Sequence, residues 1–170
     1  MKKILLLGLA VIFLAACEKQ KQQYFSESPE IETVKVGIKA YETQDWTTWK
    51  ANFADTAKIY HNTIKGITPD ENLEDIQEMI SNLSSYKFDE KETFIEMVID
   101  KDDETWVNYW SVWKGKLAAN DQELTIPVHL TMQFINGKIV KEYGYWDSAP
   151  MVMAFQEIAS AKMEETIETQ

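Results

Sequence analysis

The sequence predicts an α+β domain with an antiparallel sheet in the second half of the chain. Apolar positions recur at helical spacing in three segments before residue 84, and they alternate at strand spacing from residue 94 onward. An Asn136-Gly137 pair joins the last two alternating runs. Segregated helices and strands are typical of this class, and Asn-Gly tolerates the two positive φ angles of a type I′ hairpin turn. We therefore expect a three-stranded meander over residues 105–147.

Four helices are expected. The first begins at Ser28-Pro29 and runs to about Glu42, because a serine cap and a first-turn proline precede a helical repeat of apolar residues. A short second helix follows Gln44-Asp45. The third starts at the capping box Thr68-Pro69-Asp70-Glu71, which precedes an apolar stripe that ends at Leu83. The fourth starts at Pro150 and ends in a frayed tail over residues 167–170.

The strands are expected over residues 57–63, 94–99, 105–117 and 123–134, and after the Asn-Gly turn. Side chains of a strand alternate between its two faces. His61 should therefore share a face with Ile59, with Tyr60 opposite. His129 should share a face with Thr131 and Gln133. In the last strand one face should carry Ile139, Lys141, Tyr143, Tyr145 and Asp147, and the other Val140, Glu142, Gly144 and Trp146.

The first residues have the layout of a bacterial lipoprotein signal. Two lysines precede an apolar run, and Leu14-Ala15-Ala16-Cys17 resembles a lipobox, in which the cysteine is lipidated and becomes the mature N-terminus. The expected organisation is a signal peptide over residues 1–16, a lipidated Cys17 with a tether over 17–27, and one domain over 28–166. Lipidation would hold the protein on a membrane of the bacterial cell envelope, on the periplasmic or surface side.

The charge excludes some partners. The formal net charge is −11, and loss of the two lysines in residues 1–16 would make it −13. The chain has no arginine, so it is poorly suited to nucleic acids or phosphates. Two histidines without a cysteine cluster or His-x-x-His spacing give no zinc site. No cofactor motif, phosphate loop or Gly-x-Ser-x-Gly elbow is present in the sequence.

The order of elements resembles the nuclear-transport-factor-2-like superfamily, and within it the SnoaL-like domains. The most specific stretches are DWTTWKANFADTAKIYHN (residues 45–62) and NGKIVKEYGYWD (residues 136–147), and the likeness spans about residues 31–155. The resemblance implies a curved antiparallel sheet that forms a cone around N-terminal helices, with a cavity at the wide end. Some members are polyketide cyclases or ketosteroid isomerases, and many are binding or assembly domains.

The resemblance also implies candidate site residues. Asp147 corresponds to the acid that ends the last strand of the cyclases and serves there as general acid/base. His129 and His61 are the candidates for an assisting histidine. The tyrosine and protonated acid of the isomerase oxyanion hole have no clear counterpart. Each residue also has a structural interpretation, because an acid at this point can cap a helix and a lone histidine in a strand is often a hydrogen-bonded core residue.

Three functions stay open from the sequence. The first is binding of a small apolar or carbonyl-containing ligand, with Trp110, Tyr143, Tyr145 and Tyr60 as ligand-binding residues. The second is a cyclase- or isomerase-type enzyme, in which desolvation raises the pKa of Asp147 so that it can act as base. The third is a non-catalytic interaction module that forms a homodimer through the outer face of the sheet. The fold alone does not choose among them.

Overall fold

The structure is a computed structural model that describes residues 22–168. In chain order its elements are β1 (Tyr24–Phe25), α2 (Pro29–Thr43), α3 (Trp46–Ala51), β2 (Phe53–His61), α4 (Pro69–Ile80), β3 (Leu83–Phe88), a 3-10 turn η1 (Glu90–Glu92), β4 (Phe94–Ile99), β5 (Thr105–Leu117), β6 (Glu123–Ile135), β7 (Lys138–Trp146) and α5 (Ala149–Glu168).

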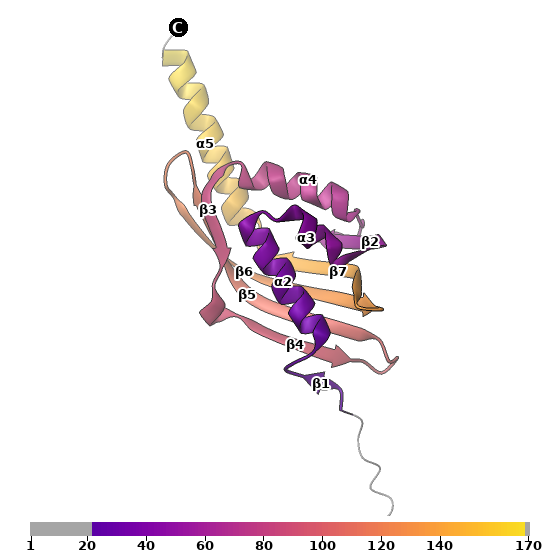
Figure 1. The fold of residues 1–170 in the computed structure, drawn as a ribbon. Helices are drawn as coiled ribbons and strands as arrows, with labels where there is room; N and C mark the ends of the chain where they lie inside the picture. Colours follow the sequence, from indigo (N-terminus) through magenta and orange to yellow (C-terminus); the bar gives the residue numbers. More distant parts are fainter. Residues whose placement is uncertain (1–21, 169–170) are drawn as a thin grey trace, which may run out of the picture.

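A curved, unclosed sheet carries the helices on one face, as the sequence predicts for an α+β cone (Figure 1). Its strand order is β1-β4-β5-β6-β7-β2, and β3 pairs with the far half of β5. The β5–β6–β7 meander is antiparallel, whereas β2 runs parallel to β7. The parallel pair places the ends of β2 and β7 at the same margin of the sheet, so residues near these two ends can meet.

Local signals in the sequence account for most boundaries. Ser28 caps α2 through a hydrogen bond from the Ile31 N–H (3.1 Å), and the capping box at Thr68 and Glu71 has both of its bonds. Asp45 caps α3. Asn136 and Gly137 have φ angles of 52° and 74°, which fit a turn with two positive φ values. The predicted bounds of β4 and β5 are confirmed.

Other boundaries differ from the expectation. β2 starts at Phe53 instead of residue 57, so residues 53–56 belong to the sheet. β3 was not predicted, because LSSYKF has no clear apolar alternation, and it owes its form to pairing with β5. Tyr24–Phe25, within the segment expected to be a tether, pair with β4.

A bulge changes which side chains of β7 face the helices. Phe134 pairs with Ile139 and Gln133 pairs with Lys141, so Val140 is an extra residue in β7. Ile139 is therefore buried on the same side as Glu142, and not on the face of Tyr143 as simple alternation predicts. The remaining alternation holds, with Glu142, Gly144 and Trp146 inward and Tyr143 and Tyr145 outward.

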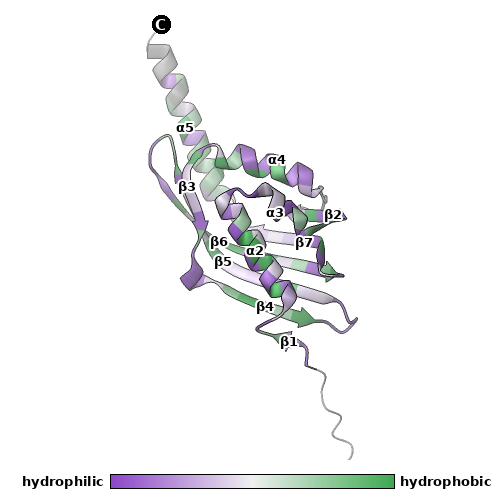
Figure 2. Ribbon diagram, viewed as in Figure 1, coloured by the Kyte–Doolittle hydropathy of each residue, from purple (hydrophilic) through white to green (hydrophobic). Residues whose placement is uncertain are grey.

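The core lies between the inner face of the sheet and α2. Its most buried side chains include Ile31 and Val34 of α2, Ile59 of β2, and Val107 and Leu117 of β5. Figure 2 shows the hydrophobic colour along the strands and on parts of the helices, with hydrophilic turns between the strands. α5 packs through its first half, where Ala154 is 1% exposed, and its far end extends away from the sheet (Figure 1). No helix among residues 22–168 has the length and apolar character to cross a membrane.

Candidate functional site

A cavity of about 520 Å³ lies between the inner face of the sheet and helices α2 and α4. Its walls are mainly apolar, and the sequence builds them from the helical stripes and the inward positions of β6. The side chains that define its shape include Val34, Ile38, Ile76, Met79, Val128 and Leu130. The volume is within the range of about 300–1,000 Å³ that is usual for small-molecule sites.

A histidine–carboxylate pair faces this cavity. His61 Nε2 lies 2.8 Å from Glu142 Oε1, and both residues line the cavity. The two side chains come from neighbouring parallel strands, because His61 is in register with Gly144 and Ile59 with Glu142. Their side chains are only 22% and 9% exposed. The pair therefore offers a hydrogen-bonding and proton-transfer group inside a mostly apolar space.

Three neighbours fix the position of His61. Gly144 leaves room for the imidazole, since a Cβ there would lie 2.6 Å from His61 Cδ2. The Trp146 ring meets the imidazole edge to face with a centroid distance of 4.9 Å. Asn62 adopts a positive φ of 52°, and its amide exchanges two hydrogen bonds with the backbone of Trp146 (2.9 and 3.2 Å). These contacts join the ends of β2 and β7, so the ring cannot easily rotate away from Glu142.

Aromatic residues line another part of the cavity. Trp113 Nε1 donates to the Tyr41 hydroxyl (3.0 Å), and burial raises the pKa of Tyr41 far above its ordinary value. Tyr41 therefore stays protonated, and its hydroxyl hydrogen has no acceptor among the described residues. Phe88 packs against Tyr41, and its N–H donates to Glu42 Oε1 (2.9 Å). Sequence reasoning named Tyr60, Tyr143 and Tyr145 as ligand-binding residues and did not single out Tyr41, the tyrosine that lines the cavity.

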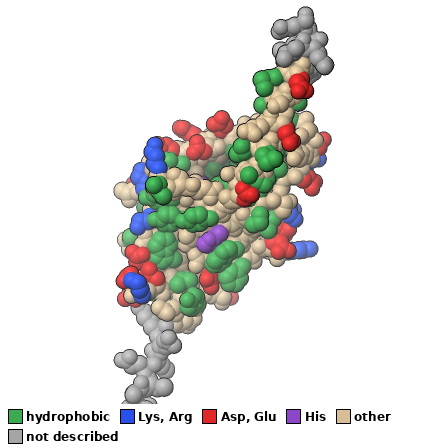
Figure 3. All heavy atoms as spheres, turned by 180° about the vertical axis from the view of Figure 1, so that it is seen from behind, with side chains coloured by type: hydrophobic (Ala, Val, Ile, Leu, Met, Phe, Trp, Pro, Cys, Tyr) green, Lys and Arg blue, Asp and Glu red, His purple; other side chains and the backbone are tan. Residues whose placement is uncertain are grey.

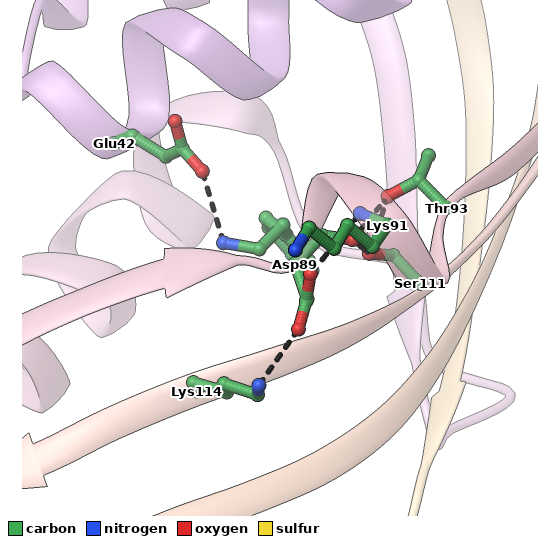
Figure 4. Close-up of polar contacts among 7 residues, drawn as sticks. Glu42, Asp89, Lys91, Thr93, Ser111 and Lys114 are labelled. Carbon is green, nitrogen blue, oxygen red and sulfur yellow. Dashed lines mark hydrogen bonds and ion pairs between the residues drawn. The ribbon is translucent and has the colours of Figure 1, made fainter.

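The loop that follows β3 is held by a polar cluster. Asp89 accepts from Lys114 Nζ (2.7 Å) and from the Lys91 N–H (3.0 Å), and its backbone oxygen accepts from the Thr93 hydroxyl (2.8 Å) (Figure 4). The Lys114 and Lys91 hydrogen bonds lower the pKa of Asp89. Because Phe88 directly precedes this cluster, the same bonds fix one wall of the cavity.

The structure places five of the seven predicted side chains on the outer face of the sheet. The rings of Trp110 and His129 stack at 4.6 Å, and Tyr145 lies beside His129 at 6.3 Å. Tyr60 and Tyr143 stack at 4.8 Å in the adjoining row. None of these five lines the cavity. Figure 3, which views the molecule from behind, shows hydrophobic side chains gathered around a histidine, with acidic side chains around them.

Asp147 lies exposed after the end of β7 and is not part of the cavity wall. Its Oδ1 accepts from the N–H of Ala149 (2.9 Å), the first residue of α5, in an Asx turn that precedes the helix. Of the three predicted acid/base residues, the structure therefore places only His61 in the cavity, beside a carboxylate that was not predicted. The catalytic roles of Asp147, His129 and His61 stay predictions.

Glu142 is the residue that sequence reasoning missed. The alternation of β7 places it on the side of Gly144 and Trp146, and that signal was available in the sequence. The sequence did not show which face of the strand is inward, because the aromatic residues on the other face resemble a core pattern. The single charged residue on the Trp146 face was the available indication of a buried acid.

The remaining site predictions concern the N-terminal residues and metal binding. Cys17 and the signal peptide over residues 1–16 are outside the described part of the chain. Within residues 22–168, no group of three His, Cys, Asp or Glu side chains is placed to hold a metal ion.

Comparisons with known proteins identify the fold. No protein-family model matches the sequence, and no curated protein matches it. Solved structures do match. A candidate polyketide cyclase from Xanthomonas campestris has a TM-score of 0.62 at 13% identity, over 74% of this chain and 95% of its own. A nuclear-transport-factor-2-like protein of unknown function from Burkholderia pseudomallei has a TM-score of 0.59 at 17% identity, over 75% and 97%.

A candidate SnoaL-like polyketide cyclase from Shewanella putrefaciens has a TM-score of 0.58 at 10% identity, over 77% of this chain and 88% of its own. At these identities the likeness shows the fold alone. The chain therefore has the nuclear-transport-factor-2-like, SnoaL-like fold that its motifs predict.

Proposed function

We propose that this chain binds a small, mostly apolar molecule with a carbonyl oxygen in the cavity inside the cone, next to the His61–Glu142 pair. The observation that carries this proposal is an apolar cavity of about 520 Å³ with a buried histidine–carboxylate pair in its wall. The volume suits one small ligand, and the convergence of a few polar groups in an apolar space is typical of ligand sites. The Xanthomonas and Shewanella structures are described as candidate polyketide cyclases, and polyketides are rich in carbonyl groups.

The pair itself supports a functional role for the cavity. Removing an ionised carboxylate from water costs several kcal/mol, and an apolar pair of equal volume often stabilises a core as well or better. Glu142 is 7% exposed, in a wall made mainly of apolar side chains. Stability alone therefore gives no reason for a carboxylate at this position, whereas contact with a ligand does.

A pair of tryptophan substitutions on α4 tests ligand binding. Ile76 lines the cavity and Gln77, the next residue, is exposed. We expect Ile76→Trp to fill part of the cavity and to lower the affinity for 2-acetylnaphthalene at least tenfold in isothermal titration calorimetry. Gln77→Trp should bind like the unmodified chain. Equal affinity for all three proteins would contradict binding in the cavity.

The second candidate function is an enzyme that removes a proton next to a carbonyl group. The His61–Glu142 pair favours it, because a base in a desolvated cavity can accept that proton while a hydrogen-bond donor of the cavity wall stabilises the enolate oxygen. The proton leaves the carbon, the electron pair moves onto the carbonyl oxygen, and reprotonation from solvent completes an exchange. Asp147 remains the base that the resemblance suggests.

Hydrogen–deuterium exchange of the ligand distinguishes the His61–Glu142 pair from Asp147 as the base. In D₂O, NMR follows deuterium incorporation into the methyl group of 2-acetylnaphthalene. With His61–Glu142 as the base, Glu142→Gln should lower the catalysed rate at least 100-fold, and Asp147→Asn should leave it within twofold. The opposite pattern would identify Asp147. No catalysed exchange in the unmodified chain would leave ligand binding as the function.

The location proposed for this site is the surface of a membrane in the bacterial cell envelope, through lipid on Cys17. The support is the apolar run before Leu14-Ala15-Ala16-Cys17. Residue 22, where the described structure begins, is five positions from Cys17. An extended chain spans at most about 3.6 Å per residue, so residue 22 would lie within roughly 20 Å of the bilayer. The partner proposed for the outer face of the sheet is a second copy of the chain, because an uncharged aromatic surface framed by acidic side chains has the composition of an interface core.

A further inference from the structure

Two amide groups in the cavity wall lack hydrogen-bond partners. The Nδ2 atoms of Asn52 and Asn72 are buried, and none of the described groups accepts from either. Asn72 is only 3% exposed, and both residues line the cavity. A buried donor without a partner costs about 1–3 kcal/mol, and native structures contain few of them. We call Asn52 and Asn72 together the amide subsite.

The amide subsite lies on the helix side of the cavity. Asn52 follows α3 and Asn72 is in the first turn of α4. Lys50 and Asp70, each two residues earlier, form an ion pair of 2.5 Å that joins these two helices. His61 and Glu142 instead enter the cavity from the sheet. The cavity therefore has polar groups on two walls of different origin.

Gly37 leaves space for the side-chain amide of Asn52. A Cβ at Gly37 would lie 3.0 Å from Asn52 Nδ2, which is tighter than ordinary packing allows. Gly37 lies in the interior of α2, where glycine costs about 1 kcal/mol relative to alanine. The helix thus includes an unfavourable residue at a position where a side chain would press on the amide of Asn52.

The chemistry of the two walls differs. His61 and Glu142 satisfy each other, whereas the amide subsite offers N–H donors and needs an acceptor. The carboxylates of Glu142 and Asp75 outnumber the one lysine in the described cavity lining, Lys65, and the net charge of the chain is −11, so an anionic ligand is disfavoured. A neutral carbonyl, hydroxyl or ether oxygen accepts a hydrogen bond and carries no negative charge, so it suits this cavity.

We propose that the amide subsite binds a neutral oxygen acceptor of the ligand and holds the ligand's apolar body between α4 and the His61–Glu142 pair. This inference rests on the proposed function and adds the chemical class of the ligand and its orientation. Asn52 and Asn72 bind and orient; they take no part in proton transfer.

Two nearly isosteric probes test this inference. 2-Acetylnaphthalene carries a carbonyl oxygen, and 2-isopropenylnaphthalene has a CH₂ group in its place. Calorimetry with the full-length protein in detergent should show about a threefold to tenfold preference for the ketone, as one or two net hydrogen bonds imply. Asn72→Leu and Asn52→Leu should each reduce this preference to less than twofold by weakening ketone binding, with no loss for the hydrocarbon. Gln77→Leu, the same kind of change at an exposed position of α4 outside the cavity wall, should keep the preference.

The outcomes separate the two proposals. If both probes bind equally to the unmodified chain, or if the preference survives in the Asn52→Leu/Asn72→Leu double variant, the amide subsite is wrong and the cavity remains a binding site. If neither probe binds, the proposed function fails and this inference fails with it.

Thermal unfolding without ligand gives an independent check. Because both amide donors are unpaired, replacement of either asparagine by leucine should leave the Tm unchanged or raise it by a few degrees. Gly37→Ala should weaken ketone binding more than hydrocarbon binding, because it displaces the Asn52 amide. A Tm lower by more than 5 °C for Asn72→Leu would assign that amide a structural role and contradict the proposal.

Discussion

Glycine at position 144 decides how His61 meets Glu142. A Cβ there would lie 2.6 Å from His61 Cδ2 and 2.7 Å from Trp146 Cζ3, so any larger residue must displace one of these rings. The two hydrogen bonds between the Asn62 side chain and the Trp146 backbone limit how far either ring can move. The geometry of the pair thus depends on the absence of a side chain between two strands.

Gly144→Ala is therefore expected to lower the free energy of unfolding by about 1–3 kcal/mol, the usual range for overpacking. Urea denaturation measures the loss. The same substitution in a His61→Ala background should cost less, since the clash with the imidazole is gone, and a double-mutant cycle gives the coupling energy. Full stability of Gly144→Ala in the unmodified background would show that the rings are free to move.

The sequence predicted the orientation of His61 but not which face of β7 points inward. His61 was placed correctly by alternation with Ile59, because β2 has a regular pattern near its end. The inward face of β7 was assigned less well, because Tyr143 and Tyr145 resemble core residues yet stack on the outer face. Their burial depends on which side the helices cover, and a strand's own residues do not contain that information.

Among the elements, the cluster at Asp89 connects the end of β3 to β5. Lys114 on β5 and the N–H of Lys91 lower the pKa of Asp89, mainly through the Lys114 hydrogen bond. A carboxyl group whose pKa is lower in the folded state than its ordinary 3.8 stabilises the fold above that value. This contribution is lost as the pH falls through the lowered pKa.

Asp89→Asn should accordingly be less stable than the unmodified chain at pH 7, and the difference should shrink as the pH falls below the ordinary pKa of 3.8. Urea unfolding at several pH values measures this. Asp55→Asn, at an exposed position of β2, is the control and should change little at any pH. A stability difference for Asp89→Asn that is constant down to pH 2 would contradict an ionic origin.

Elements with strong local signals were predictable and elements that depend on partners were not. The capping box of α4 and the Asn-Gly turn before β7 are local chemistry, and both are confirmed. β3 and the bulge at Val140 arise from pairing with other strands, so the residues of these segments do not specify them alone. The bulge also matters for the site, because it turns both Ile139 and Glu142 inward.

At the scale of the whole molecule, the sheet has two faces with different predicted roles. The inner face carries the cavity, and the outer face carries the aromatic rows with Trp110, His129 and Tyr143. The resemblance to a known fold predicted the cone and its cavity, and the solved neighbours confirm the fold. It did not predict the cavity wall, because wall residues differ among proteins that share a backbone.

The aromatic outer face of the sheet leads us to expect a homodimer. Tyr145 is 53% exposed there, and Val36 is 47% exposed on α2. Light scattering on the detergent-solubilised protein should give a dimer that Tyr145→Lys dissociates and Val36→Lys does not. A monomer at all accessible concentrations would contradict a homodimer through this face.

The two histidines report separately on the two faces of the sheet, because His61 lies in the cavity and His129 on the outer face. The measurement is a two-dimensional ¹H–¹³C NMR spectrum of the histidine side chains during titration with 2-acetylnaphthalene, with the two signals assigned by His129→Gln. Binding beside the His61–Glu142 pair predicts a saturable shift of the His61 signal and an unchanged His129 signal. A shift of His129 alone, or of neither histidine, would contradict the cavity as the ligand site.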